Sequence, residues 1–318
     1  MIAAILAAFT PLGREALAQA VRPPRRVAVL FSGGREQYYE DFKAELRLRG
    51  YVEYRNLEIL PKWAMGELSR LPGLVEELLK FEPEVIVTSS TAATVAVQRT
   101  GTKIPVVMAT SADPVRSGFV ASLARPEGNI TGLASLSVQL SIQTVELMQA
   151  VVPKARRYAV LLTRNSAYDA QMPEILAAAD KLGITIVTRR ANSIEDLEEV
   201  FAGIQKDGIE AVVVFGDAVF VRLRRKLAAL ARRVKVPAIY QWRSHVEAGG
   251  LMSYGPKISQ GWKVAARYVD RILKGADPAA TPVEQVTIFE LIINTAAARG
   301  LKLDIPKQIL QRADALIE

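Results

Sequence analysis

The sequence feature that most constrains the fold is a regular alternation of apolar, strand-like runs with helix-like segments. It begins at Val27-Ala28-Val29-Leu30-Phe31 and continues through apolar runs at 57–60, 85–87 and 105–108, with a helix-like segment between the runs. Continuous apolar strands are typical of a sheet that is buried on both faces. The alternation therefore predicts a doubly wound, Rossmann-like α/β domain with a parallel sheet.

The same rhythm starts again at Tyr158 and runs through apolar segments at 184–188, 211–215 and 237–240. The two halves match at a fixed spacing, since Glu84-Val85-Ile86-Val87 precedes Glu210-Ala211-Val212-Val213 by 126 residues. An internal repeat of this size indicates two similar units. We therefore predict two doubly wound lobes that face each other.

The segment after residue 256 is too short for a third domain, so we expect the chain to return to the first lobe and then to the second. Three crossings, near 129–132, 251–256 and 283–288, would form a three-strand hinge. The expected division is residues 25–130 plus 256–284 for lobe 1, and 131–255 plus 285–318 for lobe 2.

Four hydroxyl residues in a row, Thr88 to Thr91, follow the apolar run at 85–87 and precede a helix opening. Ligands of doubly wound sheets bind beyond the carboxyl ends of the strands. A hydroxyl at a helix start caps the helix, and the N–H groups of the first turn attract anions. One hydroxyl is enough for a cap, so Ser89, Ser90 and Thr91 are candidates for binding a ligand carboxylate.

The repeat places a carboxylate in the second lobe where the first has a hydroxyl, because Asp217 lies 126 residues after Thr91. Hydroxyls on one side and a carboxylate on the other would suit a zwitterion, whose buried ammonium group needs an anionic partner. The alternative for Asp217 is a plain helix cap.

Other strand ends supply the remaining candidates. Asp113 precedes a proline and is equally a turn former, and Trp242 either stacks on a planar ligand or lies at the rim. These further ligand-binding candidates are Ser32, Gly33, Ser111, Asp113, Asn165, Gln241 and Trp242.

Composition excludes several classes of function. The chain has no cysteine and one histidine, His245, which rules out disulfides, thiolate chemistry and a His-rich metal site. No nucleophile elbow or phosphate-binding Gly motif is present. We predict no catalytic residue, no metal and no cofactor. The net charge is +8, but the cations are scattered without a nucleic-acid-binding motif, so no nucleic acid partner is expected.

The N-terminus resembles a secretory signal peptide. An apolar core from Ile2 to Phe9 is followed by Pro11, Gly13 and the small-x-small pattern Ala18-Gln19-Ala20. About eight apolar residues are too few for a membrane span. No Lys or Arg precedes the apolar core, so we expect that the natural start lies upstream or that the leader is shortened. Residues 1–20 are predicted to direct the protein to the periplasm.

Three long segments, 83–136, 236–256 and 272–306, resemble the ABC transporter substrate-binding proteins of the tryptophan/tyrosine-binding type. The most specific part runs from Asp113 to Gly132 as DPV-SG-V-SLARP-GN-TG, and the resemblance extends from about residue 25 to the end. The chain departs from the family's usual pattern at Ser111-Ala112 and at Gln241-Trp242.

The resemblance implies a type I periplasmic-binding-protein fold that closes on a small organic solute, with an amino acid, and first an aromatic one, as the leading candidate. It also implies delivery to an ABC permease in the inner membrane by a monomeric protein that is not an enzyme. Two alternatives stay open. One is a ligand-sensing regulatory domain of the same fold, and the other is an α/β enzyme with a carboxylate-based site.

Overall fold

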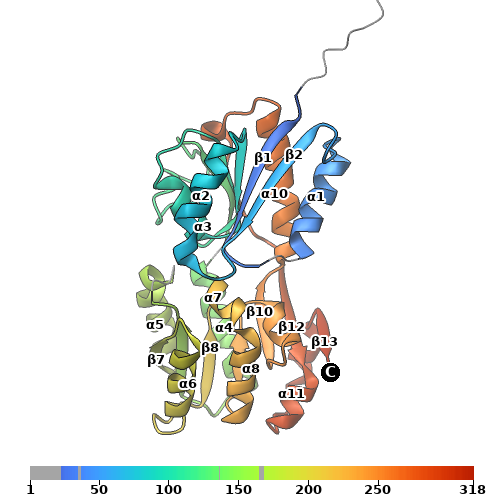
Figure 1. Ribbon diagram of the computed structural model, residues 1–318. Coiled ribbons are helices and arrows are strands. Elements are labelled where there is room, and N and C mark those ends of the chain that lie inside the picture. The colour runs from blue at the N-terminus through green and yellow to red at the C-terminus, as the bar shows by residue number, and fades with distance from the viewer. Residues whose placement is uncertain (1–22, 35–36, 136, 165–167) are drawn as a thin grey trace, which may run out of the picture.

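The computed structural model describes residues 23–34, 37–135, 137–164 and 168–318. The predicted signal peptide and Asn165 lie outside these ranges. The described chain forms two α/β lobes, one above the other in Figure 1, each built around its own sheet. The predicted fold class is thereby confirmed.

The first lobe contains a six-stranded parallel sheet in the order β11-β5-β4-β3-β1-β2. The strands at its centre are buried because their residues are apolar on both faces, as in β1, where Val27 to Leu30 are fully buried. The strands are β1 (Arg25–Phe31), β2 (Leu57–Trp63), β3 (Val85–Thr88), β4 (Val106–Ser111), β5 (Ile130–Ala134) and β11 (Glu284–Gln285).

Helices cover both faces of this sheet. One face packs against α1 and α10, and the other against α2 and α3. Helix α2 shows how the sequence sets the packing, since Leu71, Leu74, Val75 and Leu78 recur at helical spacing and are its buried residues. The helices are α1 (Gln37–Leu48), η1 (Leu68–Arg70), α2 (Leu71–Lys80), α3 (Thr91–Gln98), α10 (Ile258–Leu273) and η3 (Pro278–Ala280).

The second lobe contains a seven-stranded sheet in the order β13-β12-β10-β9-β8-β6-β7, in which only the pair β10–β12 is antiparallel. Five consecutive strands of each lobe share one order, β2-β1-β3-β4-β5 and β7-β6-β8-β9-β10, as the sequence repeat predicts. The strands are β6 (Arg157–Leu162), β7 (Thr185–Arg190), β8 (Ala211–Val214), β9 (Ala238–Tyr240), β10 (Met252–Pro256), β12 (Phe289–Asn294) and β13 (Ala315–Ile317).

The second sheet is also covered on both faces. Helices α4, α5, α11 and α12 contribute to the core on one face, and α6, α7 and α8 to the core on the other. The helices are α4 (Ser137–Val151), η2 (Asp169–Gln171), α5 (Met172–Lys181), α6 (Ile194–Gly203), α7 (Ala218–Arg222), α8 (Arg224–Arg233), α9 (Arg243–Glu247), α11 (Thr295–Gly300) and α12 (Lys307–Arg312).

The chain passes between the sheets three times: after Ala134, between Pro256 and Ile258, and between Gln285 and Phe289. These crossings form the expected three-segment connection. Strand β5 pairs with the first sheet up to Ala134, and the predicted lobe boundaries stay a prediction. In the part of the chain that the structure describes, no helix combines the length and apolar character needed to cross a membrane.

Candidate ligand-binding site between the two sheets

A cavity of about 860 Å³ lies between the lobes, at the carboxyl ends of both sets of parallel strands. Its volume is within the usual range for small-molecule sites. Nine residues predicted from the sequence line it: Ser32, Gly33, Ser89, Ser90, Thr91, Ser111, Asp217, Gln241 and Trp242.

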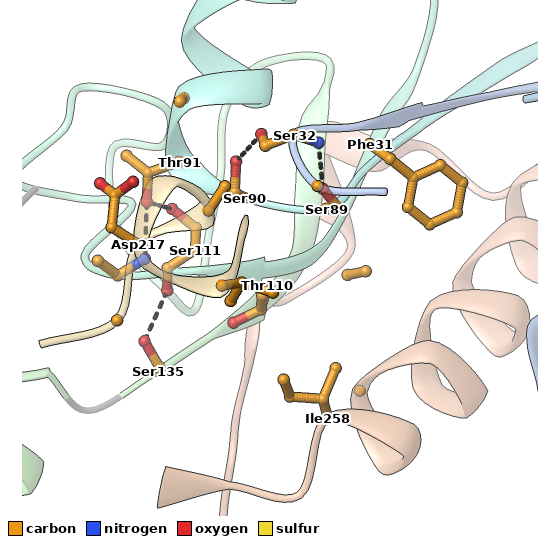
Figure 2. A pocket seen from close by; sticks show the side chains of 18 of the residues that line it. Phe31, Ser32, Ser89, Ser90, Thr91, Thr110, Ser111, Ser135, Asp217 and Ile258 are labelled. Atoms are coloured by element: carbon orange, nitrogen blue, oxygen red, sulfur yellow. Dashed lines mark hydrogen bonds between the residues drawn. The ribbon is translucent and has the colours of Figure 1, made fainter. Parts of the chain in front are cut away.

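The first lobe contributes a cluster of hydroxyl groups, shown in Figure 2. The Ser32 N–H donates to Ser89 Oγ at 2.9 Å, and the hydroxyls of Ser32 and Ser90 share a hydrogen bond of 2.5 Å. Ser90 is also the N-cap of α3, because its Oγ accepts from the Ala93 N–H at 3.2 Å. Thr88, by contrast, is fully buried and pairs with Thr94 behind the cavity.

A second hydroxyl pair completes this cluster. Thr91 Oγ1 accepts from the Ala112 N–H at 3.0 Å and lies 3.3 Å from Ser111 Oγ. Ser111 is the last residue of β4, and it lines the cavity at a point where the register of β4 against β5 shifts.

The cluster has hydrogen-bond donors to spare. Five hydroxyls are involved, and only two of their hydrogens are used, one within each hydroxyl pair, so three lack an acceptor among the described residues. Helix α3 adds the outward N–H groups of its first turn. This side of the cavity therefore suits an anionic, acceptor-rich group such as a carboxylate.

The second lobe contributes the Asp217 carboxylate as the N-cap of α7. Its Oδ1 accepts from the Val219 N–H at 2.8 Å and its Oδ2 from the Thr163 hydroxyl at 2.9 Å. Burial raises the pKa of Asp217, and these two hydrogen bonds oppose the rise. No Lys, Arg or His among the described residues forms an ion pair with it. A cationic ligand group would supply the missing partner and lower the pKa.

Gln241 and Trp242 line the cavity on the same side as Asp217, and both side chains pack against Gly216. Gln241 Oε1 accepts from both the Tyr168 hydroxyl and the Gly216 N–H, each at 2.5 Å. A Cβ at Gly216 would lie 2.8 Å from the Trp242 ring and would also collide with Gln241. The absence of a side chain at Gly216 lets both residues pack at the cavity edge.

An apolar wall was not predicted from the sequence. Phe31 stacks between Trp63 and Trp262, with ring centroids 5.7 and 4.9 Å apart, and both Phe31 and Trp262 line the cavity. Ile258 lies on the same side in Figure 2. Phe31 ends β1, so the strand-end rule could have found it. No local sequence pattern identifies Trp262 as a cavity residue, because it lies on α10, which follows the second crossing between the lobes.

Two predicted residues are not among those that line the cavity. Asp113 accepts from the Arg116 N–H at 3.0 Å and so stabilises a turn outside the cavity. Asn165 lies outside the described residues. His245 does not line the cavity; it is buried and stacks on Tyr240 with ring centroids 5.0 Å apart.

The lobes also touch beyond the cavity lining. Arg116 of the first lobe forms an ion pair of 3.0 Å with Glu174 of α5 in the second. Gly66 of the first lobe lies against Arg222 of the second, where an added Cβ would be 2.9 Å from the Arg222 Cβ. The lobes are therefore in contact beside the cavity, and residues at the strand ends of both lobes line it.

Comparison with known proteins gives one family match and several similar chains. A family model described as ABC transporter substrate binding protein matches residues 27–317. A tyrosine-binding protein of Clostridioides difficile (strain R20291) is 23% identical over 264 residues, which are 82% of this chain and 75% of the relative.

Two solved structures have the same fold. An ABC domain from Streptococcus pneumonia, solved in complex with L-Trp, has a TM-score of 0.85 and 24% identity, covering 92% of this chain and 100% of its own. A conserved domain protein from Vibrio cholerae has a TM-score of 0.84 and 27% identity, covering 92% and 99%.

Proposed function

Since the chain belongs to the family of ABC transporter substrate-binding proteins, we propose that it captures a zwitterionic amino acid between its lobes and delivers it to an ABC permease. Family membership confirms the resemblance predicted from the sequence, and with it the prediction that the chain is a binding protein and not an enzyme.

One observation carries the choice of ligand: the opposite polarity of the two cavity walls. The hydroxyl cluster offers donors for a carboxylate, and Asp217 offers an acceptor for an ammonium group. Charged groups that enter a closed cavity need partners that replace water, and an α-amino acid matches both walls.

The apolar wall favours a large side chain on that amino acid. Phe31 and Ile258 lie to one side of the hydroxyl cluster in Figure 2, Trp262 stacks on Phe31, and Trp242 lines the cavity from the second lobe. Aromatic rings gain from offset or edge contacts with such a surface. An aromatic amino acid is therefore the leading ligand. The similar protein from Clostridioides difficile is named for tyrosine binding, and the similar Streptococcus structure contains L-Trp, and both support an aromatic ligand.

The location and the partner belong to the same proposal. We place the protein in the periplasm, exported by the signal peptide predicted at residues 1–20, where a monomer would deliver its ligand to an inner-membrane permease. Fusing residues 1–22 to a periplasm-dependent reporter enzyme tests export. An inactive fusion would contradict the assignment of residues 1–20 as a leader that is sufficient for export.

Calorimetric titration with L-tryptophan and two analogues tests the ligand class. Indole-3-propionate lacks the ammonium group and tryptamine lacks the carboxylate, so each removes one half of the proposed recognition. We expect L-tryptophan or L-tyrosine to bind and each truncated analogue to bind at least about tenfold more weakly. Equal affinity for the three indole compounds, or no binding of any α-amino acid, would contradict the proposal.

A further inference from the structure

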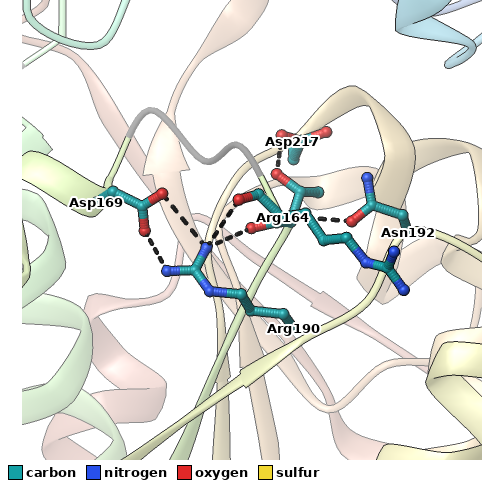
Figure 3. Close-up of polar contacts among 6 residues, drawn as sticks. Arg164, Asp169, Arg190, Asn192 and Asp217 are labelled. Carbon is teal, nitrogen blue, oxygen red and sulfur yellow. Dashed lines mark hydrogen bonds and ion pairs between the residues drawn. The ribbon is translucent and has the colours of Figure 1, made fainter.

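We propose that Arg190, which is not among the residues that line the cavity, is a positioning residue that fixes the Asp217 carboxylate and thereby sets the affinity for the ligand's cationic group. The identity of that group rests on the proposed function. The positioning itself rests on contacts within the second lobe, drawn in Figure 3.

The link to Asp217 runs through Thr163, the residue after β6. The Thr163 hydroxyl donates to Asp217 Oδ2 at 2.9 Å, and its side chain is almost fully buried. The Val219 N–H holds only the other oxygen of the carboxylate. The direction of Oδ2 therefore depends on where Thr163 lies.

Arg190, the last residue of β7, holds this part of the chain with a branched set of hydrogen bonds. Its Nη1 donates to the carbonyl oxygens of Thr163 at 2.8 Å and Arg164 at 3.3 Å. Its two terminal nitrogens also grip both oxygens of Asp169, at 2.6 and 3.3 Å. One planar guanidinium thus ties the end of β6 to the start of η2, which a point charge on lysine cannot reproduce.

Neighbouring hydrogen bonds also hold the backbone next to Thr163, but they do not connect it to Asp169 as Arg190 does. Asn192 Oδ1 accepts from the Arg164 N–H at 2.8 Å, and the Ala191 N–H donates to Leu162 at 3.0 Å. Neither contact reaches Asp169. The side chains of Arg190 and Asp169 are 39% and 41% exposed, so their ion pair adds little net stability and a variant is expected to fold.

The test that needs no ligand is a carbon NMR titration of the Asp217 carboxyl, identified by the signal that Asp217→Asn removes. Arg190→Gln should let Thr163 shift, weaken its hydrogen bond and raise the pKa of Asp217. The matched control is Arg189→Gln, which breaks an ion pair of the same 2.6 Å length with Asp207 from the adjacent position and should leave that pKa unchanged.

Combination with Thr163→Val separates positioning from the loss of a positive charge. If Arg190 acts through Thr163, Arg190→Gln should produce no further rise in the Thr163→Val background. A rise that persists there would reflect charge alone and would overturn the inference. So would an unchanged pKa in Arg190→Gln itself.

Calorimetry extends the test to binding. Arg190→Gln should weaken L-tryptophan binding about tenfold while changing the affinity for indole-3-propionate less than about twofold. Equal losses for both would indicate a general structural role and overturn the inference. If the wild-type protein binds no α-amino acid, the proposed function fails, while the NMR titration still decides whether Arg190 positions Asp217.

Discussion

Asp217→Asn is the substitution whose consequences follow most directly from the structure. It removes the negative charge but keeps an oxygen for the Val219 N–H and an amide able to bond the Thr163 hydroxyl. A charge-assisted hydrogen bond to a ligand ammonium contributes about 1.5–3 kcal/mol, and leaving that ammonium unpaired in a closed cavity adds to the loss. We expect L-tryptophan affinity to fall by about 2–4 kcal/mol, or about 30- to 1000-fold.

The same change should not destabilise the unliganded protein. Burial raises the folded-state pKa of Asp217 above its unfolded value. Its favourable contribution to stability is therefore complete only below the unfolded pKa and is lost as pH rises through the folded pKa. At neutral pH the wild-type protein bears the cost of a partly buried charge, which asparagine removes. The melting temperature of Asp217→Asn at pH 7 should equal or exceed that of the wild type.

Calorimetry for affinity and thermal unfolding for stability together check this reasoning. Asp277→Asn is the matched control, because Asp277 caps η3 in the same way, accepting from the Ala279 N–H at 2.9 Å, and is not among the residues that line the cavity. It should leave affinity unchanged. Retention of L-tryptophan binding within about threefold in Asp217→Asn would refute the charge pairing. A fall in its melting temperature would instead assign Asp217 a mainly structural role.

Three further substitutions test other parts of the site and the core. Thr91→Val removes a hydroxyl of the carboxylate-facing cluster and should weaken L-tryptophan binding by about 1–3 kcal/mol in calorimetry, whereas unchanged affinity would remove Thr91 from the site. Arg116→Gln breaks the exposed ion pair with Glu174 across the lobes and should weaken binding at most about fivefold, a difference that about 1 M salt should abolish. Burial lowers the pKa of His245 to about 4, so the wild type should lose stability as pH falls from about 6.5 to about 4; denaturant unfolding should show that His245→Phe lacks this loss.

Much of the fold could be predicted because its signals are local. Apolar strand runs and helical periodicity each extend over a few residues. The two lobes share one strand order, as the internal sequence repeat predicts. The residue-by-residue alignment of the two halves was less accurate. A fixed spacing of 126 aligned Thr91 with Asp217, yet the N-cap that corresponds to Asp217 is Ser90. The segment between β8 and its helix is one residue longer than the one after β3, which a fixed spacing cannot reveal.

The polar half of the site could be predicted, and the apolar half could not. Strand ends in doubly wound sheets meet at one edge, so hydroxyls and carboxylates just after a strand are visible in the sequence. Trp262 is different, because α10 reaches the first lobe only after the chain has left it and returned. The hydrogen bond from Arg190 to Thr163 joins the last residue of β7 to the residue after β6, and one sequence gives no sign of it.

The hydroxyl cluster of the first lobe and the Asp217 carboxylate of the second make closure of the lobes depend on the ligand. Bringing the lobes together without a ligand takes water away from Asp217 before any cation is present, and this disfavours the charged carboxylate. The ligand's ammonium group reverses the cost, so the ligand favours the closed form over the open one and shifts the population towards closure. Asparagine at position 217 removes both effects. Unliganded Asp217→Asn should therefore be more compact than the unliganded wild type in small-angle scattering, and should compact less when L-tryptophan is added.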